Sequence, residues 1–365
     1  MSNPTDLEQI ESRIVSFVED FAFLRTDDEN DAVVGQCRRL ADAVAAQAVT
    51  SSEGGKRLRA LLTLEAFRAF ASDEDIENHI DEVFGLACAI EVFQTGALVH
   101  DDIIDDSDLR RGKPSAHRAL ATQSGDDTIG RGLGIMLGDM LATSSVDIVN
   151  RSVAGLDRGP DIISAFLNMH REVEIGQVLD LAVELNSLND PDELARTSLN
   201  VFRWKTASYT TIAPLEFGML AAGETRRSAR EQALAIGLPL GLAFQLADDL
   251  LDVIGSSRNT GKPVGGDIRE GKRTVLLADA LNAATSEEKA ELVGMWESPA
   301  RSEEQVNRAI ALFESTGAIE RSRGRIAELW SESETAIRSL GLPEERENAL
   351  IETCARFVPT VQREQ

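Results

Sequence analysis

The 365-residue sequence is short of several residue types, and each shortage excludes a class of protein. Its three cysteines, Cys37, Cys88 and Cys354, show no CxxC spacing. This argues against a disulfide framework or a zinc knuckle and favours a reducing compartment. Only 10 residues are proline and only 5% are aromatic. Because alanine, leucine and glutamate are abundant instead, the composition favours helices over strands.

Basic residues are also scarce, since 37 Lys and Arg face 62 Asp and Glu and give a net charge of −25. A protein this acidic is not expected to bind nucleic acid through a basic surface. The polar first residues lack the basic and apolar regions of a signal peptide, and no run approaches 18 uninterrupted apolar residues. We therefore expect a cytoplasmic protein with no membrane span.

Apolar residues recur at three- and four-residue steps along most of the chain, which predicts helices. The longest are expected over residues 7–24, 76–106, 129–151, 161–187, 191–222 and 228–254, with shorter ones from 273 to 357. Pro214 and Pro239 should kink or break two of them, and residues 110–117 read as a loop. We predict a single all-α domain over residues 1–365, with 1–30 and 358–365 peripheral.

The strongest local signal is a DDxxD motif formed by Asp101, Asp102 and Asp105 within residues 98–112. On a helix, positions i and i+4 share a face, so Asp101 and Asp105 aim two carboxylates at one point. Mg²⁺ binds through one or two carboxylates plus substrate phosphates, and it would relieve their repulsion. The alternative is a solvated acidic helix end, which the apolar residues before the motif make less fitting.

A second DDxxD motif, Asp248, Asp249 and Asp252, is surrounded by apolar residues within 244–255. Burying several carboxylates without a counter-charge is costly. Two such motifs, each at the end of an apolar helix, are more specific than either alone. They predict a helical bundle with a cavity between the motifs.

Clustered basic residues accompany the acidic motifs. The segment GGKRLR at 54–59 places a flexible turn before a helix start, where backbone N–H groups favour a phosphate and Lys56 and Arg59 add charge. Arg110 and Arg111 follow the first motif and can bind phosphate oxygens or merely neutralise the aspartates. An ordinary surface turn is the alternative for residues 54–59.

Seven blocks together give a family resemblance: GGKRLR at 54–59, HDDIIDDSDLRRGKPSAH at 100–117, LGD at 137–139, EIGQVLDL at 174–181, WKTASY at 204–209, FQLADDLLDVIG at 244–255 and GKPVGGDIREGKRT at 261–274. They resemble the trans-isoprenyl diphosphate synthase (polyprenyl synthetase) family, and most of all its geranylgeranyl diphosphate synthases. The resemblance implies an all-α fold of the isoprenoid synthase type around a deep central cavity, usually as a homodimer. It implies head-to-tail joining of isopentenyl diphosphate to an allylic diphosphate.

The resemblance also implies roles for single residues. Three Mg²⁺ ions would lie between Asp101, Asp105 and Asp252, supported by Asp102, Asp248 and Asp249. The allylic diphosphate would contact Arg110, Lys205, Gln245 and Lys262. Isopentenyl diphosphate would contact Lys56, Arg59 and Arg111. The residues implied in catalysis are Asp101, Lys205, Thr206, Gln245 and Asp248, with Lys205 and Thr206 on an expected helix break facing the developing cation. The chain departs from the family at Gln94, a position that is usually His at the isopentenyl site, and this puts substrate affinity in doubt.

Product length is predicted from the helix before Asp101, along which the family's product tail runs. Gly96 and Ala97 are small and should leave the cavity open, whereas Phe93, about 12 Å before Asp101 on a helix, is the next bulky side chain. We therefore predict a C20 product, with Phe93 as a cavity floor or as plain core. The alternatives are a longer-chain polyprenyl diphosphate synthase, a class I terpene cyclase and a non-catalytic regulatory subunit. A cyclase would lack the second motif and GGKxxR, and only Gln94 favours the regulatory subunit.

Overall fold

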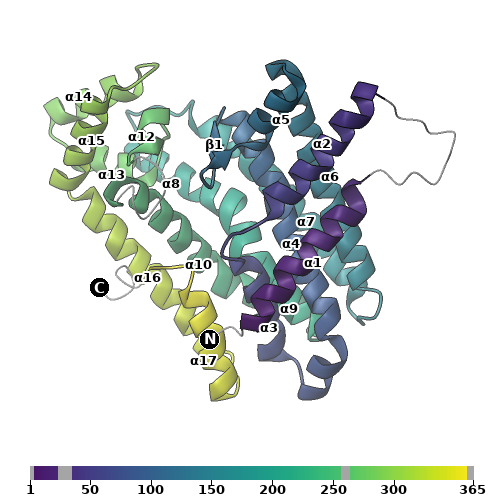
Figure 1. Ribbon diagram of the computed structural model, residues 1–365. Helices are drawn as coiled ribbons and strands as arrows, with labels where there is room; N and C mark the ends of the chain where they lie inside the picture. The colour runs from purple at the N-terminus through teal and green to yellow at the C-terminus, as the bar shows by residue number, and fades with distance from the viewer. Residues whose placement is uncertain (1–3, 24–34, 256–263, 360–365) are drawn as a thin grey trace. The chain divides into compact units, whose positions relative to one another are not determined.

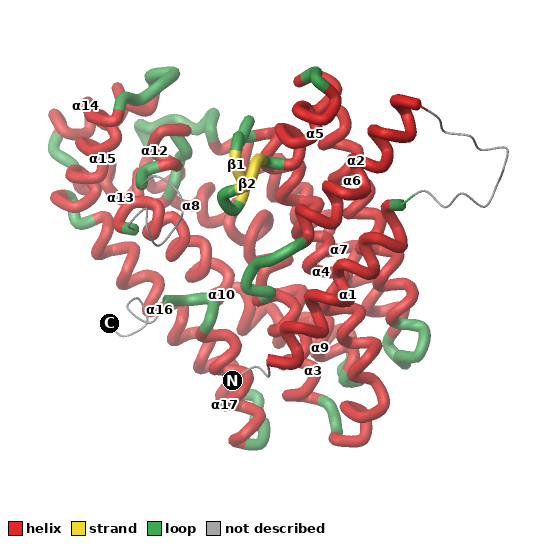
Figure 2. The backbone as a smooth tube through the Cα atoms, viewed as in Figure 1, coloured by secondary structure: helices red, strands yellow, loops and turns green. Residues whose placement is uncertain are grey.

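The computed structural model of the protein describes residues 4–23, 35–255 and 264–359. Most of these residues are helical (Figures 1 and 2), so the predicted all-α class is confirmed. The strands found among them are β1 (Leu109–Arg110) and β2 (Lys113–Pro114), which pair antiparallel. The stretch predicted as a loop therefore contains a short hairpin.

The chain forms two compact units, each built from two stretches of sequence. Unit 1 comprises residues 1–167 and 217–226, and unit 2 comprises residues 168–216 and 227–365. The chain consequently passes between the units three times, within α7 (Gly159–Val183), within α9 (Ala213–Ala221) and at the first residue of α10 (Arg226–Ile254).

Unit 1 is organised around one long buried helix. Its complete elements are α1 (Pro4–Ala22), α2 (Gly35–Ser52), α3 (Leu58–Phe70), α4 (Asp73–Ile104), the β1–β2 hairpin, α5 (Ala116–Ser124) and α6 (Asp127–Ser152). Helix α4 begins at a Ser72 cap, whose hydroxyl accepts from the Asp75 N–H, and three acidic residues in its first turn suit the helix dipole. Most of its side chains from Val83 to Val99 are buried.

Glycines allow α4 and α6 to pack closely. A Cβ atom on Gly96 would lie 3.0 Å from the Gly138 carbonyl oxygen, and one on Gly138 would collide with the His100 imidazole. The imidazole Nε2 also lies 3.1 Å from the Ile135 carbonyl oxygen, so His100 joins the two helices. Because Gly96 faces the α6 backbone, it does not border open space, and its predicted place in the cavity wall needs correction.

Unit 2 contains the remaining helices. They are α8 (Pro191–Val201), the π-helix η1 (Phe202–Ile212), α12 (Gly266–Glu270), α13 (Val275–Ala283), α14 (Ser286–Trp296), α15 (Glu303–Ser315), α16 (Ala318–Arg338) and α17 (Glu344–Ala355). Most predicted helices agree with these bounds within a few residues.

Pro239 was predicted to kink or break its helix. It lies inside α10 without ending it, so the break does not occur. A proline removes one backbone hydrogen bond and disturbs its neighbours. Two distant hydroxyls bond to carbonyls in the preceding turn. Thr211 of η1 donates to the Gly237 carbonyl at 2.6 Å, and Ser333 of α16 donates to the Ile236 carbonyl at 3.0 Å.

Three of the described helices, α4, α6 and α10, are long and apolar enough to cross a membrane, judged by length and composition alone. In α4, 78% of the most apolar window is buried inside the protein. A helix that is apolar on all sides is also typical of a buried core. The absence of a membrane span stays a prediction.

All three cysteines are free thiols, with Cys37 exposed and Cys88 and Cys354 buried. Burial raises the pKa of Cys88 to about 12, which suppresses the reactive thiolate. We expect Ellman's reagent to modify one thiol rapidly in the native protein and three after denaturation, the buried pair reacting more than ~100-fold slower. Cys37→Ser should remove the rapid phase, and rapid modification of two thiols would contradict the burial.

Candidate active site

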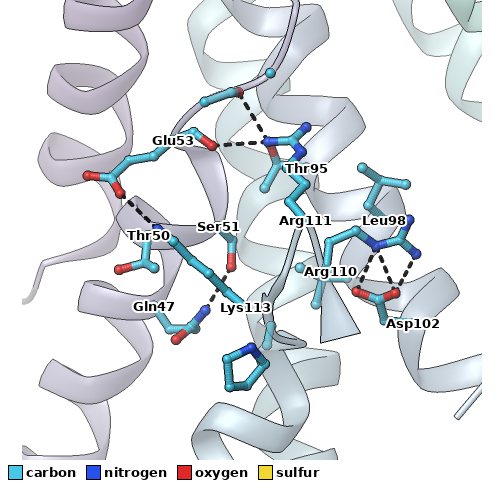
Figure 3. Close-up of a pocket in the computed structure, with 15 residues that line it drawn as sticks. Gln47, Thr50, Ser51, Glu53, Thr95, Leu98, Asp102, Arg110, Arg111 and Lys113 are labelled. Atoms are coloured by element: carbon cyan, nitrogen blue, oxygen red, sulfur yellow. Dashed lines mark hydrogen bonds and ion pairs between the residues drawn. The ribbon is translucent and has the colours of Figure 1, made fainter. Parts of the chain in front are cut away.

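A pocket of about 350 Å³ in unit 1 brings Asp102 of the first aspartate motif together with the glycine turn at 54–55, Arg110 and Arg111 (Figure 3). Its walls come from the end of α2, the turn after it, α4 and the hairpin. The lining residues are Gln47, Thr50, Ser51, Glu53, Gly54, Gly55, Thr95, Leu98, Val99, Asp102, Arg110, Arg111, Lys113, Pro114 and Ala116. Those from α4 are spaced three and four residues apart, so one helix face forms that wall.

The glycine turn at 54–55 holds Arg111 in place. The Arg111 Nη1 group donates to the Glu53 and Gly54 carbonyls at 3.0 and 3.1 Å. A Cβ atom on Gly55 would lie 3.2 Å from Arg111 Nη2, so this glycine gives the guanidinium room. Burial, followed by the positive charge of Arg57, lowers the pKa of Arg111. Such concentrated positive charge suits an anionic ligand.

Arg111 adopts a left-handed backbone conformation with φ of 52°, and Gly112 follows with φ of 75°. Positive φ at both central residues of a two-residue hairpin turn is typical of type I′. A residue other than glycine in this left-handed conformation costs of the order of 1 kcal/mol, and such strain often occurs at functional sites.

Arg110 binds the buried carboxylate of Asp102. Its Nε lies 2.9 Å from Asp102 Oδ1 and 3.2 Å from Oδ2, and its Nη2 also donates to Oδ1 (Figure 3). The Asp101 carboxylate is 3.8 Å from the same Nη2. Burial alone would lower the pKa of Arg110. The hydrogen bond to Asp102 and the negative charges of Asp101 and Asp105 raise it by more, so the pKa is higher than usual. Arg110 is therefore a fixed positive charge at the motif.

Both aspartate motifs lie at the carboxyl end of their helices. Asp101 and Asp102 are in the last turn of α4 and Asp105 is its C-cap, while Asp248, Asp249 and Asp252 are near the end of α10. Neither helix has a basic residue in its last turn. Because this end of a helix dipole is negative, clustered carboxylates there are unfavourable without a cation.

In unit 2, Asp249 is buried, with 5% of its surface exposed. Its Oδ1 accepts from Gln245 Nε2 at 2.8 Å, and its Oδ2 has no hydrogen-bond partner among the described residues. Burial, followed by the charge of Asp267, raises the pKa of Asp249 well above its usual value. A cation at this carboxylate would offset both effects.

Asp267 belongs to the same acidic cluster but was not among the predicted site residues. The Gly266 and Asp267 N–H groups donate to the Asp252 carboxylate at 3.0 and 3.1 Å. Burial and the Asp252 carboxylate raise the pKa of Asp267 to about 6, although Lys272 Nζ lies 3.7 Å away. The only sequence signal for it was its position in the glycine-rich segment 261–274.

The π-helix η1 carries Lys205 and Thr206, where the sequence predicted a helix break. A Cβ atom on Gly176 of α7 would collide with the Lys205 main chain, so α7 packs closely on η1. Lys205 Nζ lies 2.6 Å from Asp180 Oδ2, and the Thr206 hydroxyl donates to Gln245 Oε1 at 3.0 Å. Insertions of π-helix occur frequently at functional sites. Asp180, which orients Lys205, was also missed from the sequence.

The remaining predicted site residues differ in burial, and the three described ones assigned to isopentenyl diphosphate or its site do not all face the pocket. In unit 1, Lys56 is exposed in the turn, Arg59 is buried near the start of α3, and Gln94 is half-buried on α4 without lining the pocket. Lys262 lies outside the described residues. Phe93 is 5% exposed and packs edge to face against Phe166 at 6.4 Å between ring centroids.

The donor set suits Mg²⁺. All candidate ligands are carboxylates, which are the hard oxygen donors that this ion prefers. Among the described residues, no group of three or more His, Cys, Asp or Glu side chains is arranged to hold a metal ion. The candidate carboxylates are Asp101, Asp102 and Asp105 in unit 1 and Asp248, Asp249 and Asp252 in unit 2.

Comparisons with known proteins place these features in a family. A model of the polyprenyl synthetase family matches residues 42–313. Geranylgeranyl diphosphate synthase of Saccharolobus solfataricus is 31% identical over 259 residues, which cover 70% of this chain and 71% of that protein. Octaprenyl diphosphate synthase of Escherichia coli is 30% identical over 289 residues, covering 79% and 80%.

The fold comparison agrees. A crystal structure of geranylgeranyl pyrophosphate synthase from Corynebacterium glutamicum, complexed with isoprenyl diphosphate and magnesium, superposes with a TM-score of 0.84 at 29% identity. The match covers 100% of this chain and 99% of that one. Family match, relatives and fold therefore lead to one conclusion: the chain belongs to the polyprenyl synthetase family and is a trans-prenyltransferase.

Proposed function

We propose that this chain condenses isopentenyl diphosphate with allylic diphosphates in a Mg²⁺-dependent reaction and makes geranylgeranyl diphosphate as its main product. The observation that carries the proposal is the pair of intact aspartate motifs, each at the negative end of its helix. Carboxylates in that position need a cation to offset the dipole and their mutual repulsion. A diphosphate that binds together with Mg²⁺ brings this cation, and its oxygens complete the coordination of the ion. We propose three ions per site.

The substrates are assigned to different residues. We assign isopentenyl diphosphate to the pocket of unit 1, where the glycine turn, Arg111 and Lys113 offer backbone and cationic groups. Lys56, Arg59 and Gln94 are proposed to assist there. The allylic diphosphate is assigned to Arg110, Lys205, Gln245 and Lys262. The C. glutamicum structure with isoprenyl diphosphate and magnesium supports both substrate and cofactor.

The reaction depends on stabilising a leaving diphosphate. When bound, Mg²⁺ neutralises the diphosphate charge as the allylic C–O bond breaks. Arg110 and Lys205 add fixed positive charges that are most effective at that moment. The Thr206 hydroxyl is held by Gln245 and can direct its oxygen toward the allylic cation. The isopentenyl double bond then attacks the cation, and the departing diphosphate accepts the proton that is lost.

An activity assay of the chain alone tests the proposal. Isopentenyl diphosphate, Mg²⁺ and dimethylallyl, geranyl or farnesyl diphosphate should give a C20 prenyl diphosphate, and chelation of the metal with EDTA should abolish its formation. A cyclised hydrocarbon product would indicate a terpene cyclase instead. No product with any allylic substrate would support the regulatory-subunit alternative.

The length of the product is proposed to depend on Phe93 and Ala97. Ala97 lies one turn, about 6 Å, beyond Phe93 on the same face of α4. Phe93 is fixed below it by Phe166, which in turn packs on Phe217 at 5.5 Å between ring centroids. These rings would form a rigid floor for the growing chain.

Ala97→Phe should shorten the main product by one five-carbon unit, because the new ring would occupy the space above Phe93. Phe93→Ala should lengthen it, because the floor would move away. Chromatography of the dephosphorylated products measures both effects. An unchanged product distribution in both variants would refute this geometry.

We also propose that the enzyme is a homodimer in the cytoplasm. Ile129, Ile135 and Met136 of α6 expose 46%, 41% and 52% of their surface, and an exposed apolar helix face favours association. Light scattering of the purified protein would distinguish a dimer from a 39.6 kDa monomer.

A further inference from the structure

Arg57 connects the pocket turn of unit 1 to α1 and α4. It is the N-cap of α3, adopts a left-handed conformation with φ of 50°, and is only 3% exposed. It does not line the pocket, so it is unsuited to direct contact with a ligand there. A buried arginine in an unfavourable backbone conformation requires strong compensating interactions.

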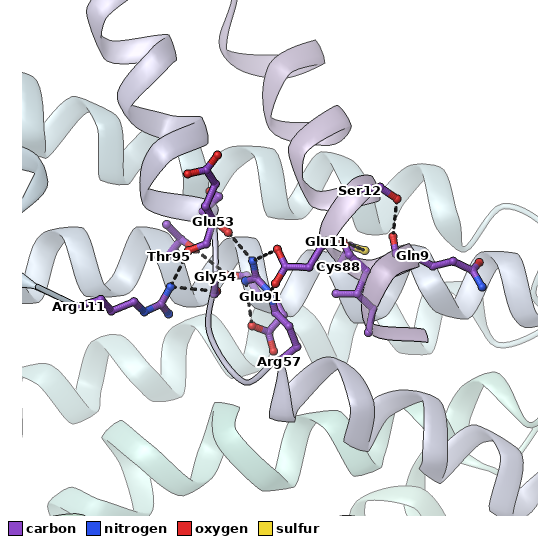
Figure 4. Close-up of polar contacts among 12 residues, drawn as sticks. Gln9, Glu11, Ser12, Glu53, Gly54, Arg57, Cys88, Glu91, Thr95 and Arg111 are labelled. Carbon is purple, nitrogen blue, oxygen red and sulfur yellow. Dashed lines mark hydrogen bonds and ion pairs between the residues drawn. The ribbon is translucent and has the colours of Figure 1, made fainter. Parts of the chain in front are cut away.

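Two carboxylates and one carbonyl supply that compensation (Figure 4). Arg57 Nε and Nη2 donate to the two oxygens of Glu11 in α1, each at 2.8 Å. Its Nη2 also donates to the Ser52 carbonyl at 2.6 Å, and its Nη1 lies 3.5 Å from Glu91 Oε2 of α4. Glu91 Oε1 accepts from the Ala60 N–H at 3.1 Å. The guanidinium therefore joins α1, the end of α2, the start of α3 and α4.

Glu11 is also bonded to the turn itself. The Gly54 N–H donates to the Glu11 carboxylate, while the Gly54 carbonyl accepts from Arg111. The hydrogen bond from Arg57 holds the pKa of Glu11 below its usual value, so the carboxylate is charged at neutral pH. Gly54 thus links the carboxylate of Glu11 to the guanidinium of Arg111.

We propose that Glu11, acting through Arg57 and Gly54, is a positioning residue for the isopentenyl diphosphate site. The inference rests on the proposed function of the pocket. Gly54 and Gly55 have φ of 71° and 106°, and two adjacent glycines can adopt many other conformations. The charged network selects one of them, and this orients the Arg111 guanidinium and the turn's N–H groups before substrate binds. Such pre-organisation increases affinity by removing the cost of ordering the site.

Glu11→Gln tests the proposal with little change in size. The neutral amide loses one acceptor and places a donor against the donors of Arg57 and Gly54. We expect KM for isopentenyl diphosphate to rise roughly tenfold, as the loss of one charge-assisted contact implies. The kcat value and KM for the allylic substrate should change less than about twofold. Glu8→Gln is the matched control, because Glu8 is exposed on the same helix and should leave every constant unchanged.

A double-mutant cycle with Arg57→Met separates positioning from general stability. If Glu11 acts through Arg57, adding Glu11→Gln to Arg57→Met should raise KM for isopentenyl diphosphate by less than about twofold more. The proposal is overturned if Glu11→Gln leaves this KM unchanged while lowering the melting temperature, or if it alters kcat and both KM values together.

Calorimetric titration with inorganic pyrophosphate, without added metal, keeps the test independent of the reaction. Failure of the wild-type chain to condense substrates would refute the proposed function. Weaker pyrophosphate binding by Glu11→Gln than by Glu8→Gln would still support the positioning role, and equal binding by both would overturn it.

Discussion

Replacing Asp101 with alanine should lower kcat/KM for condensation by at least ~10³-fold, because charge stabilisation at a leaving diphosphate contributes several kcal/mol. Stability should respond differently. Asp101 lies in the last turn of α4, where the dipole disfavours a carboxylate, and its contact with Arg110 is long at 3.8 Å. We expect the free energy of unfolding to change by less than about 1 kcal/mol. Steady-state assays and urea denaturation measure the two effects.

Asp108→Ala is the control for this experiment. Asp108 lies three residues beyond the motif, pairs with Arg118 and has a side chain that is 80% exposed. Its loss should alter activity less than about twofold, since exposed ion pairs contribute little. Equal activity of the Asp101 and Asp108 variants would contradict the metal-binding role of the first motif.

The aspartate motifs were predictable because their signal is local. The spacing of Asp101 and Asp105 fixes their relation once the segment is helical, and the apolar residues before them predict the helix. The same holds for Asp248 and Asp252 on α10. The substrates, by contrast, were predicted from the family resemblance, because helix periodicity carries no information about them.

The environment of the turn at 54–57 was not predictable, because it depends on distant residues. Arg57 is separated by 46 residues from Glu11 and by 34 from Glu91, and nothing in the local pattern selects these partners. The hairpin turn at Arg111 was missed for a different reason. Type I′ turns are signalled by Asn-Gly or Asp-Gly, whereas here Arg-Gly adopts the conformation.

Pro239 shows how tertiary contacts override a local rule. Read alone, it predicts a kink or a break in α10. The helix continues, and hydroxyls from Thr211 and Ser333 bond to carbonyls of the preceding turn. At Gly96, the small side chain predicted open space in the cavity. In the structure this glycine instead allows α4 to pack closely against α6. Neither outcome can be derived from periodicity, because each depends on which element lies opposite.

Replacing Arg110 with methionine should reduce both stability and activity. The Asp102 carboxylate would remain buried, with 2% of its surface exposed, without the guanidinium that now binds both of its oxygens. Removing one partner of a buried ion pair costs about 3–5 kcal/mol, which urea denaturation would detect. We expect kcat/KM to fall by at least ~100-fold, because the diphosphate loses a fixed positive charge.

The double variant Arg110→Met/Asp102→Leu separates these two effects. Replacing both members of a buried ion pair with apolar groups is often neutral or stabilising, so the free energy of unfolding should return to within about 1 kcal/mol of the wild-type value. Activity should stay low, because the substrate, unlike the fold, needs the guanidinium itself, and because Asp102 is also assigned to support the metal. Arg110→Lys should keep part of the activity, since its ammonium preserves the charge but cannot form the two-pronged contact with Asp102. Recovery of full activity in the double variant would mean that neither the Arg110 guanidinium nor the Asp102 carboxylate is needed for the reaction, and the assignments of Arg110 to the allylic diphosphate and of Asp102 to the metal would then be wrong.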